Sequence, residues 1–543
     1  MSTLIHYRGG AIFTSDTQPW AESIVVEDGR IAYVGDTATA DALPVDEVVE
    51  LDGAVMLPGI VDAHTHLVGM GESLTQIDLQ DAEDLADIQG RLRDAAASAP
   101  GTERMIGRSW LFSALDGRPP HRDMIDAVVS DRPVYLNAND SHSAWVNSAA
   151  LAELGIDDDT PDPLGGTIER DAAGHATGML RETAALGLMR DRLDELVSDA
   201  AREDALRAAF DRYLAAGVTA AVDMALGEPE LRALVAVQTS RGGSLPMRVA
   251  AHWVVDRTGT PEGDLAGVAR AIELAAEHAG PWLRVTGIKL FVDGVIDSCT
   301  AAMRAPFADG SHPEALWDLP SLSAVVTAAD AAGLQVAMHA IGDAASALAL
   351  DALDAAVAAN GPRADRRHRI EHLETVDAAT PTRLARLGVI ASVQPVHSDP
   401  AIQENWRAML GDARVERGFP WGELADAGAT LALGTDAPTA PYDPLANLYI
   451  AATRKSAFDR SLPPNIPRHA MAIADAVRRA TRDAAYAARW DGELGVLRRG
   501  AAADFFVIDV DPFRDGADVL LDSAVRFTVL AGEVVHSAAA LRA

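Results

Sequence analysis

Short apolar runs alternate with longer helix-forming segments through the middle of the chain. The runs are rich in β-branched residues and end in polar residues, whereas the segments between them are rich in Ala and Leu. Alternating strands and helices predict a parallel sheet, and eight such units predict a closed (β/α)8 barrel, the TIM barrel of the α/β class. Functional side chains of such barrels lie at the carboxyl ends of the strands. The predicted strands are residues 57–66, 217–224, 247–255, 285–294, 334–343, 367–374, 388–397 and 430–438.

Both ends of the chain carry a different pattern, in which apolar and polar residues alternate. The sequence IVVEDGRIAYVG shows it around an Asp-Gly pair, which is typical of a hairpin turn. Because neither end is large enough to form a core alone, we expect one composite β-sandwich domain from residues 1–56 and 495–543. The barrel domain then spans residues 57–494. The expected terminal strands lie within residues 3–14, 23–35, 47–56, 503–511 and 525–536.

A long interval separates the first and second predicted barrel strands. Residues 68–210 contain helix-forming segments at 82–98 and 186–214 and several loop-rich pieces. This pattern predicts a large insertion after the first barrel strand. Because the loops of a barrel's carboxyl end build its binding pocket, we expect the insertion to lie over the barrel mouth.

Composition and charge exclude several classes of partner. Asp and Glu total 80 residues against 46 Lys and Arg, giving a net charge of −34. Such a field repels phosphate backbones and anionic lipid, so we expect a small-molecule substrate and neither a nucleic acid nor a membrane partner. The single cysteine, Cys299, fits a reducing compartment, and with no secretion signal or membrane-spanning stretch we expect a cytoplasmic protein. A homodimer is the expected assembly because symmetric homo-oligomers are common.

The first barrel strand ends in two histidines, in the sequence LPGIVDAHTHL of residues 57–67. His64 and His66 point to the same face of a strand, with Cα atoms about 6–7 Å apart. Two imidazoles placed in this way can converge on one metal ion. The alternative is two histidines that only make hydrogen bonds at a strand end.

Further metal-ligand side chains follow other predicted strands. His339 ends the fifth, His372 the sixth and Asp436 the eighth, so a barrel brings all of them to its mouth. Imidazole and carboxylate groups are standard zinc ligands. Taken singly, each residue could be an ordinary buried polar group, and Asp436 could cap a helix. Taken together, they predict a divalent metal site, with zinc favoured and one or two ions per subunit.

Lys289 lies within the apolar run of the fourth strand. A buried lysinium is costly, so one interpretation is a salt bridge to Asp293 or Asp297. Burial also lowers the pKa of a lysine, and the neutral amine can react with carbon dioxide. The resulting N6-carboxylated lysine is an anionic ligand that can bridge two metal ions.

These motifs resemble the amidohydrolase superfamily of metal-dependent hydrolases, in particular the amidohydrolase-3 branch with N-substituted formamide deformylase-like proteins. The resemblance covers essentially the whole chain and implies the barrel, the composite β-sandwich and a metal site from His64, His66, Lys289, His339, His372 and Asp436. The motifs, in family order, are LPGIVDAHTHL, GGTIERDAAGHATGML, GIKLFVDG, MHAIGD, RIEHLE, SVQPVH, LGTDAP and GELGVLRRGAAADFFVIDVDP.

The resemblance indicates a hydrolase that cleaves a C–N bond of an amide, an N-substituted formamide or a related small molecule. Asp436 is the expected catalytic base, because it can take a proton from a metal-activated water. A metal-dependent isomerase, decarboxylase or C–O hydrolase on the same site remains an alternative, as does a non-catalytic binding protein. Substrate contacts are expected from Trp110, His142, Glu182, Asp293, Gln394 and His397.

Overall fold

The chain forms two compact units in the computed structural model, which describes residues 3–80, 82–101, 103–138, 143–163, 166–401 and 404–538. The first unit combines Met1–Met70 with Leu206–Ala543, and the second is Gly71–Ala205. The helices α2 (Leu67–Ser73) and α7 (Asp199–Ala215) run across the two points where the chain passes between units.

Eight parallel strands form the central sheet of the first unit, in the order in which they occur along the chain. Each of the eight predicted barrel strands corresponds to one of them, so the predicted barrel fold is confirmed. The strands are β6 (Ile60–Thr65), β13 (Val218–Leu226), β14 (Arg248–Val254), β15 (Leu283–Phe291), β16 (Gln335–Ala340), β17 (Arg369–His372), β18 (Ile390–Val393) and β19 (Leu431–Leu433).

The first and last barrel strands meet just beyond β19. The backbone N–H of Asp436 donates to the carbonyl of His64 at 2.7 Å, and that of His66 donates to Ala437 at 2.9 Å. These bonds join the two ends of the sheet at the level of the predicted metal ligands. The residue at 434 must be small here, because a Cβ atom on Gly434 would lie 2.5 Å from the His64 nitrogen.

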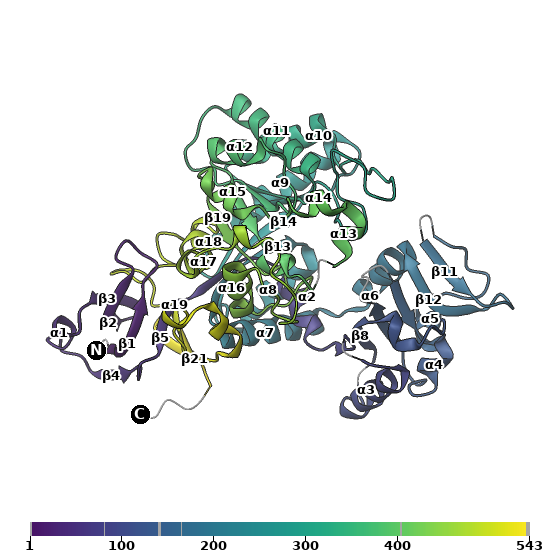
Figure 1. The fold of residues 1–543 in the computed structure, drawn as a ribbon, viewed down its shortest axis with the longest axis horizontal. Coiled ribbons are helices and arrows are strands. Elements are labelled where there is room, and N and C mark those ends of the chain that lie inside the picture. The colour runs from purple at the N-terminus through teal and green to yellow at the C-terminus, as the bar shows by residue number, and fades with distance from the viewer. Residues whose placement is uncertain are drawn as a thin grey trace. The chain divides into compact units, whose positions relative to one another are not determined.

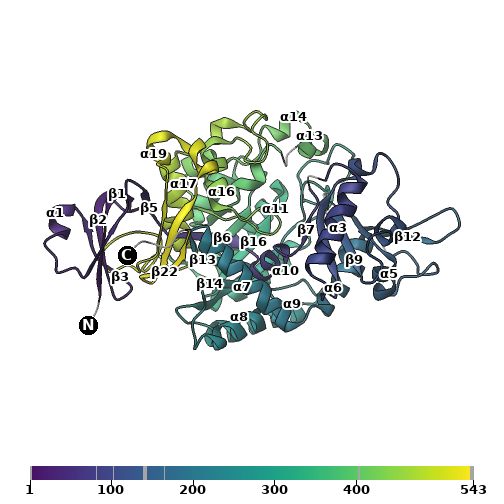
Figure 2. The ribbon, with the colours of Figure 1, turned by 90° about the horizontal axis from the view of Figure 1, so that it is seen from below.

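Helices flank the barrel strands, and Figure 2 shows α8 and α9 beside β14. Alanines and other small apolar residues pack between strands and helices in a fully buried cluster that includes Val61, Val222, Ile390 and Trp490. The helices are α8 (Glu228–Ser240), α9 (Pro261–Glu277), α10 (Leu319–Ala331), α11 (Asp343–Asn360), α12 (Thr380–Leu387), α13 (Glu404–Leu410), α14 (Asp412–Val415), α15 (Trp421–Asp426), α16 (Pro444–Thr453), α17 (Ile473–Ala480) and α18 (Arg482–Ala487), with 3₁₀ turns η3 (Pro395–Ser398) and η4 (Pro467–His469).

Both ends of the chain build one eight-stranded sheet, here called the terminal sheet. Its N-terminal strands are purple and its C-terminal strand β21 is yellow in Figure 1, and β20 pairs with β5 to join them. Tyr7, Ile24, Phe505 and Phe527 share its core. The elements are β1 (Leu4–Phe13), β2 (Trp20–Glu27), β3 (Arg30–Gly35), α1 (Thr37–Ala40), β4 (Glu47–Glu50), β5 (Val55–Pro58), β20 (Phe505–Ile508), α19 (Pro512–Asp515), η5 (Ala517–Asp522), β21 (Val525–Leu530) and β22 (Glu533–Ser537).

The second unit, Gly71–Ala205, corresponds to the insertion predicted after the first barrel strand and has its own six-stranded sheet and core. Trp110 and Trp145 are fully buried in that core, with ring centroids 5.4 Å apart. Its elements are β7 (Ile77–Asp78), α3 (Leu85–Ser98), β8 (Met105–Trp110), η1 (Phe112–Leu115), α4 (Arg122–Asp126), β9 (Val134–Ala138), β10 (Ser143–Val146), α5 (Ser148–Leu154), β11 (Gly166–Arg170), β12 (Ala176–Glu182), the π-helix η2 (Ala184–Met189) and α6 (Arg190–Leu196).

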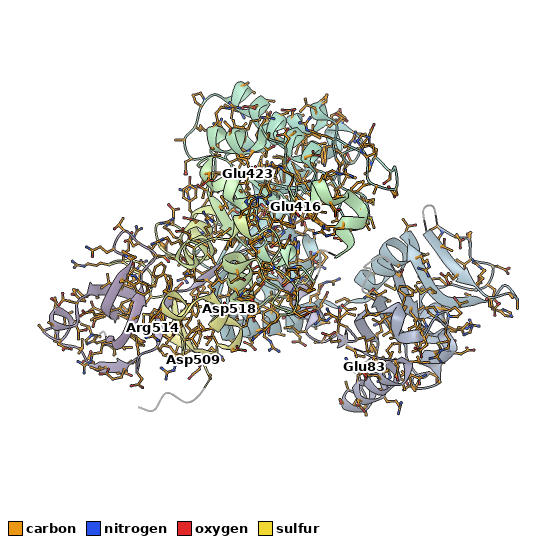
Figure 3. All side chains as sticks on the ribbon, viewed as in Figure 1. Glu83, Glu416, Glu423, Asp509, Arg514 and Asp518 are labelled. Carbon is orange, nitrogen blue, oxygen red and sulfur yellow. The ribbon has the colours of Figure 1, made fainter. Side chains whose placement is uncertain are left out.

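Figure 3 draws the described side chains as sticks and labels several charged residues, two of which form ion pairs in the first unit. Glu423 pairs with Arg417 at 2.8 Å, and Asp518 pairs with Lys455 at 2.9 Å. In the part of the chain that the structure describes, no helix combines the length and the apolar character needed to cross a membrane.

Candidate metal centre

His64 and His66 lie together at the carboxyl end of β6. Their ring centroids are 5.5 Å apart, as expected from the two-residue period of a strand. His64 is buried, and its backbone N–H donates to the Asp62 carboxylate at 3.1 Å. Asp62 also accepts bonds from Thr435 and Tyr213, so it ties the end of β6 to the segment that follows β19.

A buried carboxylate orients the His64 ring. Glu371 Oε2 lies 2.7 Å from His64 Nδ1, and Arg369 holds the same carboxylate through its Nε and Nη2 atoms. Burial alone would raise the pKa of Glu371, but Arg369 and His64 outweigh it and lower this pKa well below its usual value. The ionised carboxylate accepts a hydrogen bond from Nδ1–H and leaves Nε2 of His64 free to bind a cation.

Asp436 stands between histidines from several strands. Its Oδ1 atom lies 3.3 Å from His64 Nε2 and 3.1 Å from His66 Nε2. Its Oδ2 atom lies 3.9 Å from His372 Nδ1 and 3.4 Å from His397 Nε2. The ligand atoms of His64, His372 and Asp436 all lie within 4.8 Å of one another, which is close enough to share one cation.

The backbone is strained where these side chains are presented. His372 has φ of +76° and Asp436 has φ of +61°, a region that residues other than glycine rarely adopt. Such conformations persist only where the surrounding structure imposes them, and they concentrate at functional sites. Leu373, which follows His372, has φ of +49° as well.

His339 and Lys289 complete the predicted ligand set on β16 and β15. The His339 and His372 ring centroids are 4.4 Å apart, and His339 Nε2 lies 3.1 Å from the Gly294 carbonyl. Lys289 is almost fully buried, and its Nζ lies 5.0 Å from the Phe291 ring centroid. Among the described residues it has no ion-pair partner, so the salt bridge considered from the sequence is not formed.

The protonation states suit metal binding. Burial lowers the pKa of His64 to about 4 and that of His339 to about 3, and it lowers that of His372 well below its usual value. Burial opposes ionisation of Asp436, but the neighbouring histidines outweigh it and hold the pKa of this carboxyl well below its usual value. Neutral imidazoles and an ionised carboxylate are the forms that coordinate divalent cations.

The predicted substrate contacts are divided between the two units. In the barrel unit, Gln394 Oε1 lies 2.9 Å from His372 Nδ1, and His397 contacts Asp436. Asp293 instead accepts three backbone N–H groups, from Ala302, Ile341 and Gly342. It therefore anchors loops beside His339, and burial raises its pKa to about 7.

In the second unit, the structure gives Trp110 a packing role. Its side chain is fully buried, and Nε1 donates to the Leu136 carbonyl at 3.0 Å. His142 lies outside the described residues, as does the side chain of Glu182. Their contacts with substrate remain predictions.

Sequence reasoning missed two carboxylates, Glu371 and Glu374. Both belong to the RIEHLE motif, in which Glu371 immediately precedes His372 and Glu374 lies two residues after it. The two-residue period places Glu371 on the same face of β17 as Arg369, which was a readable signal for a buried pair. Glu374 bonds to His397, with Oε1 3.1 Å from Nδ1.

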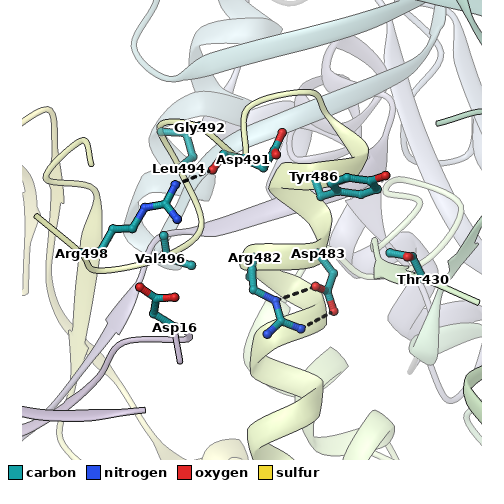
Figure 4. A pocket seen from close by; sticks show the side chains of 10 residues that line it. All are labelled: Asp16, Thr430, Arg482, Asp483, Tyr486, Asp491, Gly492, Leu494, Val496 and Arg498. Atoms are coloured by element: carbon teal, nitrogen blue, oxygen red, sulfur yellow. Dashed lines mark hydrogen bonds and ion pairs between the residues drawn. The ribbon is translucent and has the colours of Figure 1, made fainter. Parts of the chain in front are cut away.

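A pocket of about 420 Å³ lies away from this cluster. Figure 4 shows Thr430, Arg482, Asp483 and Tyr486 along its wall. Thr430 immediately precedes β19 and Asp436 follows it, so pocket and histidine cluster lie at opposite ends of that strand. Because barrel enzymes place their chemistry at the carboxyl ends, the histidine cluster is the candidate site.

The chain belongs to the amidohydrolase family, whose model matches residues 47–536. It is 32% identical to the protein LONG AFTER FAR-RED 3 of Arabidopsis thaliana over 92% of this chain and 86% of that one. It is 30% identical to the putative amidohydrolase YtcJ of Bacillus subtilis over 98% of this chain and 99% of that one.

A further relative supports the amidohydrolase-3 branch, and a solved structure supports the barrel fold. The N-substituted formamide deformylase of Arthrobacter pascens is 27% identical over 91% of this chain and 90% of its own length. The crystal structure of an uncharacterized metal-dependent hydrolase from Pyrococcus horikoshii OT3 superposes with a TM-score of 0.78 at 26% identity, covering 95% of this chain and 99% of that one. The resemblance inferred from the sequence motifs is confirmed, and the chain is a member of a hydrolase family.

Proposed function

We propose that this protein is a metal-dependent hydrolase that cleaves a C–N bond in an amide, an N-substituted formamide or a related small molecule. The observation that carries the proposal is the position of Asp436, with one carboxylate oxygen 3.1 Å and 3.3 Å from the Nε2 atoms of two histidines. A carboxylate among neutral imidazoles at the carboxyl ends of barrel strands suits both cation binding and proton transfer. The family membership and the deformylase relative support C–N cleavage.

His64, His66, His339, His372 and Asp436 would hold one or two cations. The residues fit this role because burial lowers the pKa of His64, His339 and His372, while the neighbouring histidines hold the pKa of Asp436 well below its usual value. When bound, a divalent cation such as zinc supplies Lewis acidity and lowers the pKa of a water molecule to near neutrality.

Asp436 is the proposed proton carrier. Its carboxylate accepts the proton of the attacking water and then donates it to the leaving amine. If only one of His339 and His372 binds a cation, the other stabilises the negative charge that develops on the carbonyl oxygen. Glu371 holds the His64 ring in place during these steps through the 2.7 Å contact to Nδ1.

Lys289 is proposed to be N6-carboxylated and to bridge two cations. Burial lowers the pKa of this amine to about 8, although the negative charges of Glu371 and Asp436 act in the opposite direction. Part of the Lys289 population is therefore neutral near physiological pH. The neutral amine is the form that reacts with carbon dioxide. An anionic bridge offsets the repulsion between two neighbouring cations.

Amine release tests the proposal. Purified protein, reconstituted with zinc, is incubated with a panel of N-substituted formamides and small amides, and the free amine is quantified. The proposal expects turnover that depends on metal. If the products instead retain the C–N bond, as an isomerase or a C–O hydrolase would leave it, the assignment is wrong even if metal is bound.

A further inference from the structure

The Asp436 carboxylate faces two different groups of histidines. Oδ1 faces His64 and His66, and Oδ2 faces His372 and His397. A carboxylate with this arrangement can serve two cations, one on each oxygen. Oδ2 of Asp436 is therefore a potential ligand atom on the side away from His64 and His66.

A second carboxylate reaches the same side. Glu374 lies two residues beyond His372, and its Oε1 is 3.1 Å from Nδ1 of His397, which lies in the turn η3 after β18. The ligand atoms of His372, Glu374 and His397 all lie within 4.8 Å of one another. The rings of His372 and His397 are nearly parallel, 8° apart, with centroids separated by 5.7 Å.

This corner holds two buried carboxylates. Among the described residues, neither Glu374 nor Asp436 has a Lys or Arg within ion-pair distance, and the side chains that face their carboxylates are histidines. Buried carboxylates are costly unless a positive charge compensates them. Asp297 adds a further negative charge that acts on Glu374 and His397.

We propose that His372, Glu374 and His397 form an additional divalent-cation site, with Asp436 Oδ2 as a ligand shared with the His64–His66 side. Two histidines and one carboxylate are a common set for zinc and for other first-row divalent metals. The inference rests on the proposed metal centre, because it shares Asp436 with it. His372 then serves the additional site alone, since a neutral imidazole has one nitrogen free to bind a cation. It is independent of whether Lys289 carries a carbamate. The competing interpretation is a plain His397–Glu374 ion pair without metal.

Anomalous diffraction from zinc-reconstituted crystals locates the ions directly. The proposal expects a peak within bonding distance of Glu374 and His397. It is overturned if the anomalous peaks lie only beside His64 and His66, or only beside Lys289 and His339. Turnover is measured on the same preparation, so an inactive protein with this peak would refute the proposed function while leaving the cation site standing.

Metal content of matched variants gives a second readout. Glu374→Gln keeps an oxygen that accepts a hydrogen bond from His397 but removes the anionic ligand. We expect it to lose one equivalent of zinc by elemental analysis, as does His397→Gln. Glu423→Gln, at a partly exposed residue that pairs with Arg417 and is labelled in Figure 3, is the control and should keep full metal content. Unchanged metal content in both Glu374→Gln and His397→Gln, with folding verified by circular dichroism, contradicts the proposal.

Discussion

Glu371 and His64 form a buried contact in which Oε2 of the carboxylate lies 2.7 Å from Nδ1 of the imidazole. The contact decides which nitrogen of His64 carries the proton and which is free to bind a cation. It joins the sixth and the first strands of the barrel, and Arg369 keeps the carboxylate charged. The proposed metal centre thus depends on an ion pair inside the barrel as well as on the ligands at its mouth.

Substitution of Glu371 should weaken metal binding. Partners that orient metal-bound histidines contribute about 10- to 100-fold in affinity, so we expect Glu371→Ala to raise the zinc Kd by about that factor. Glu371→Gln still offers an oxygen to His64 Nδ1 and should weaken binding less. Competition with a chromophoric chelator measures both. Equal affinities for wild type and both variants would show that the contact does not orient a ligand.

Asp436→Asn keeps the shape of the side chain but removes its basicity. General acid–base catalysis contributes about 10²–10⁴-fold, so kcat should fall by at least about that factor. Steady-state kinetics on zinc-reconstituted variant, with metal content measured in parallel, separates lost catalysis from lost metal. A near-normal kcat with metal retained would assign the base to another residue.

Lys289→Ala should lower the metal content and reduce activity, because it removes the proposed anionic bridge. A short carboxylic acid added to the variant is expected to restore part of both by occupying the vacated position. Elemental analysis and amine release provide the two readouts. Electron density that shows an unmodified Lys289 amine beside a fully loaded metal centre would contradict the carbamate.

Asp330 should stabilise the barrel in a pH-dependent manner. This buried carboxylate bonds to Arg366 and His368 ahead of β17, at 2.9 Å and 3.0 Å. Burial alone would raise its pKa, but hydrogen bonds from His368, Arg366 and Asn360 outweigh it and lower the pKa below the usual 3.8. A lowered folded-state pKa gives stability that is fully present above pH 3.8 and is lost as the pH falls towards the folded-state value.

Asp330→Ala is therefore expected to reduce the free energy of unfolding by about 3–5 kcal/mol at neutral pH, since it leaves Arg366 buried without its partner. Asp518→Ala, which breaks only an exposed pair with Lys455, should cost about 0–1 kcal/mol. Urea unfolding at several pH values measures both variants. A difference between wild type and Asp330→Ala that does not shrink in acid would contradict the assignment.

The barrel was predictable because local patterns determine its strands. Most of the apolar runs are buried on both faces and end where polar side chains emerge, as at His339 in β16 and His372 in β17. The predicted strand at 430–438 is shorter in the structure, where β19 covers Leu431–Leu433. The chain leaves extended geometry to reach the positive φ of Asp436, and a hydrophobic pattern carries no signal for that turn.

The site was predictable in its ligand types but not in its supporting contacts. The spacing of His64 and His66 follows from strand geometry, whereas the contact between His64 and Glu371 spans 307 residues of sequence. Spacing along the chain does not reveal which carboxylate faces which imidazole across a barrel. Trp110 was expected to contact substrate, but its side chain is buried in the core of the second unit. The sequence alone does not distinguish an aromatic residue of a binding surface from one of a core.

The most direct test of the central claim is amine release by one protein sample before and after metal exchange. Dialysis against a strong chelator should abolish the cleavage of a responsive amide or N-substituted formamide. Addition of zinc, manganese or cobalt should restore it, because Asp436 and the surrounding histidines are suited to hold a divalent cation. Full cleavage activity in a sample shown by elemental analysis to be free of metal would contradict the account.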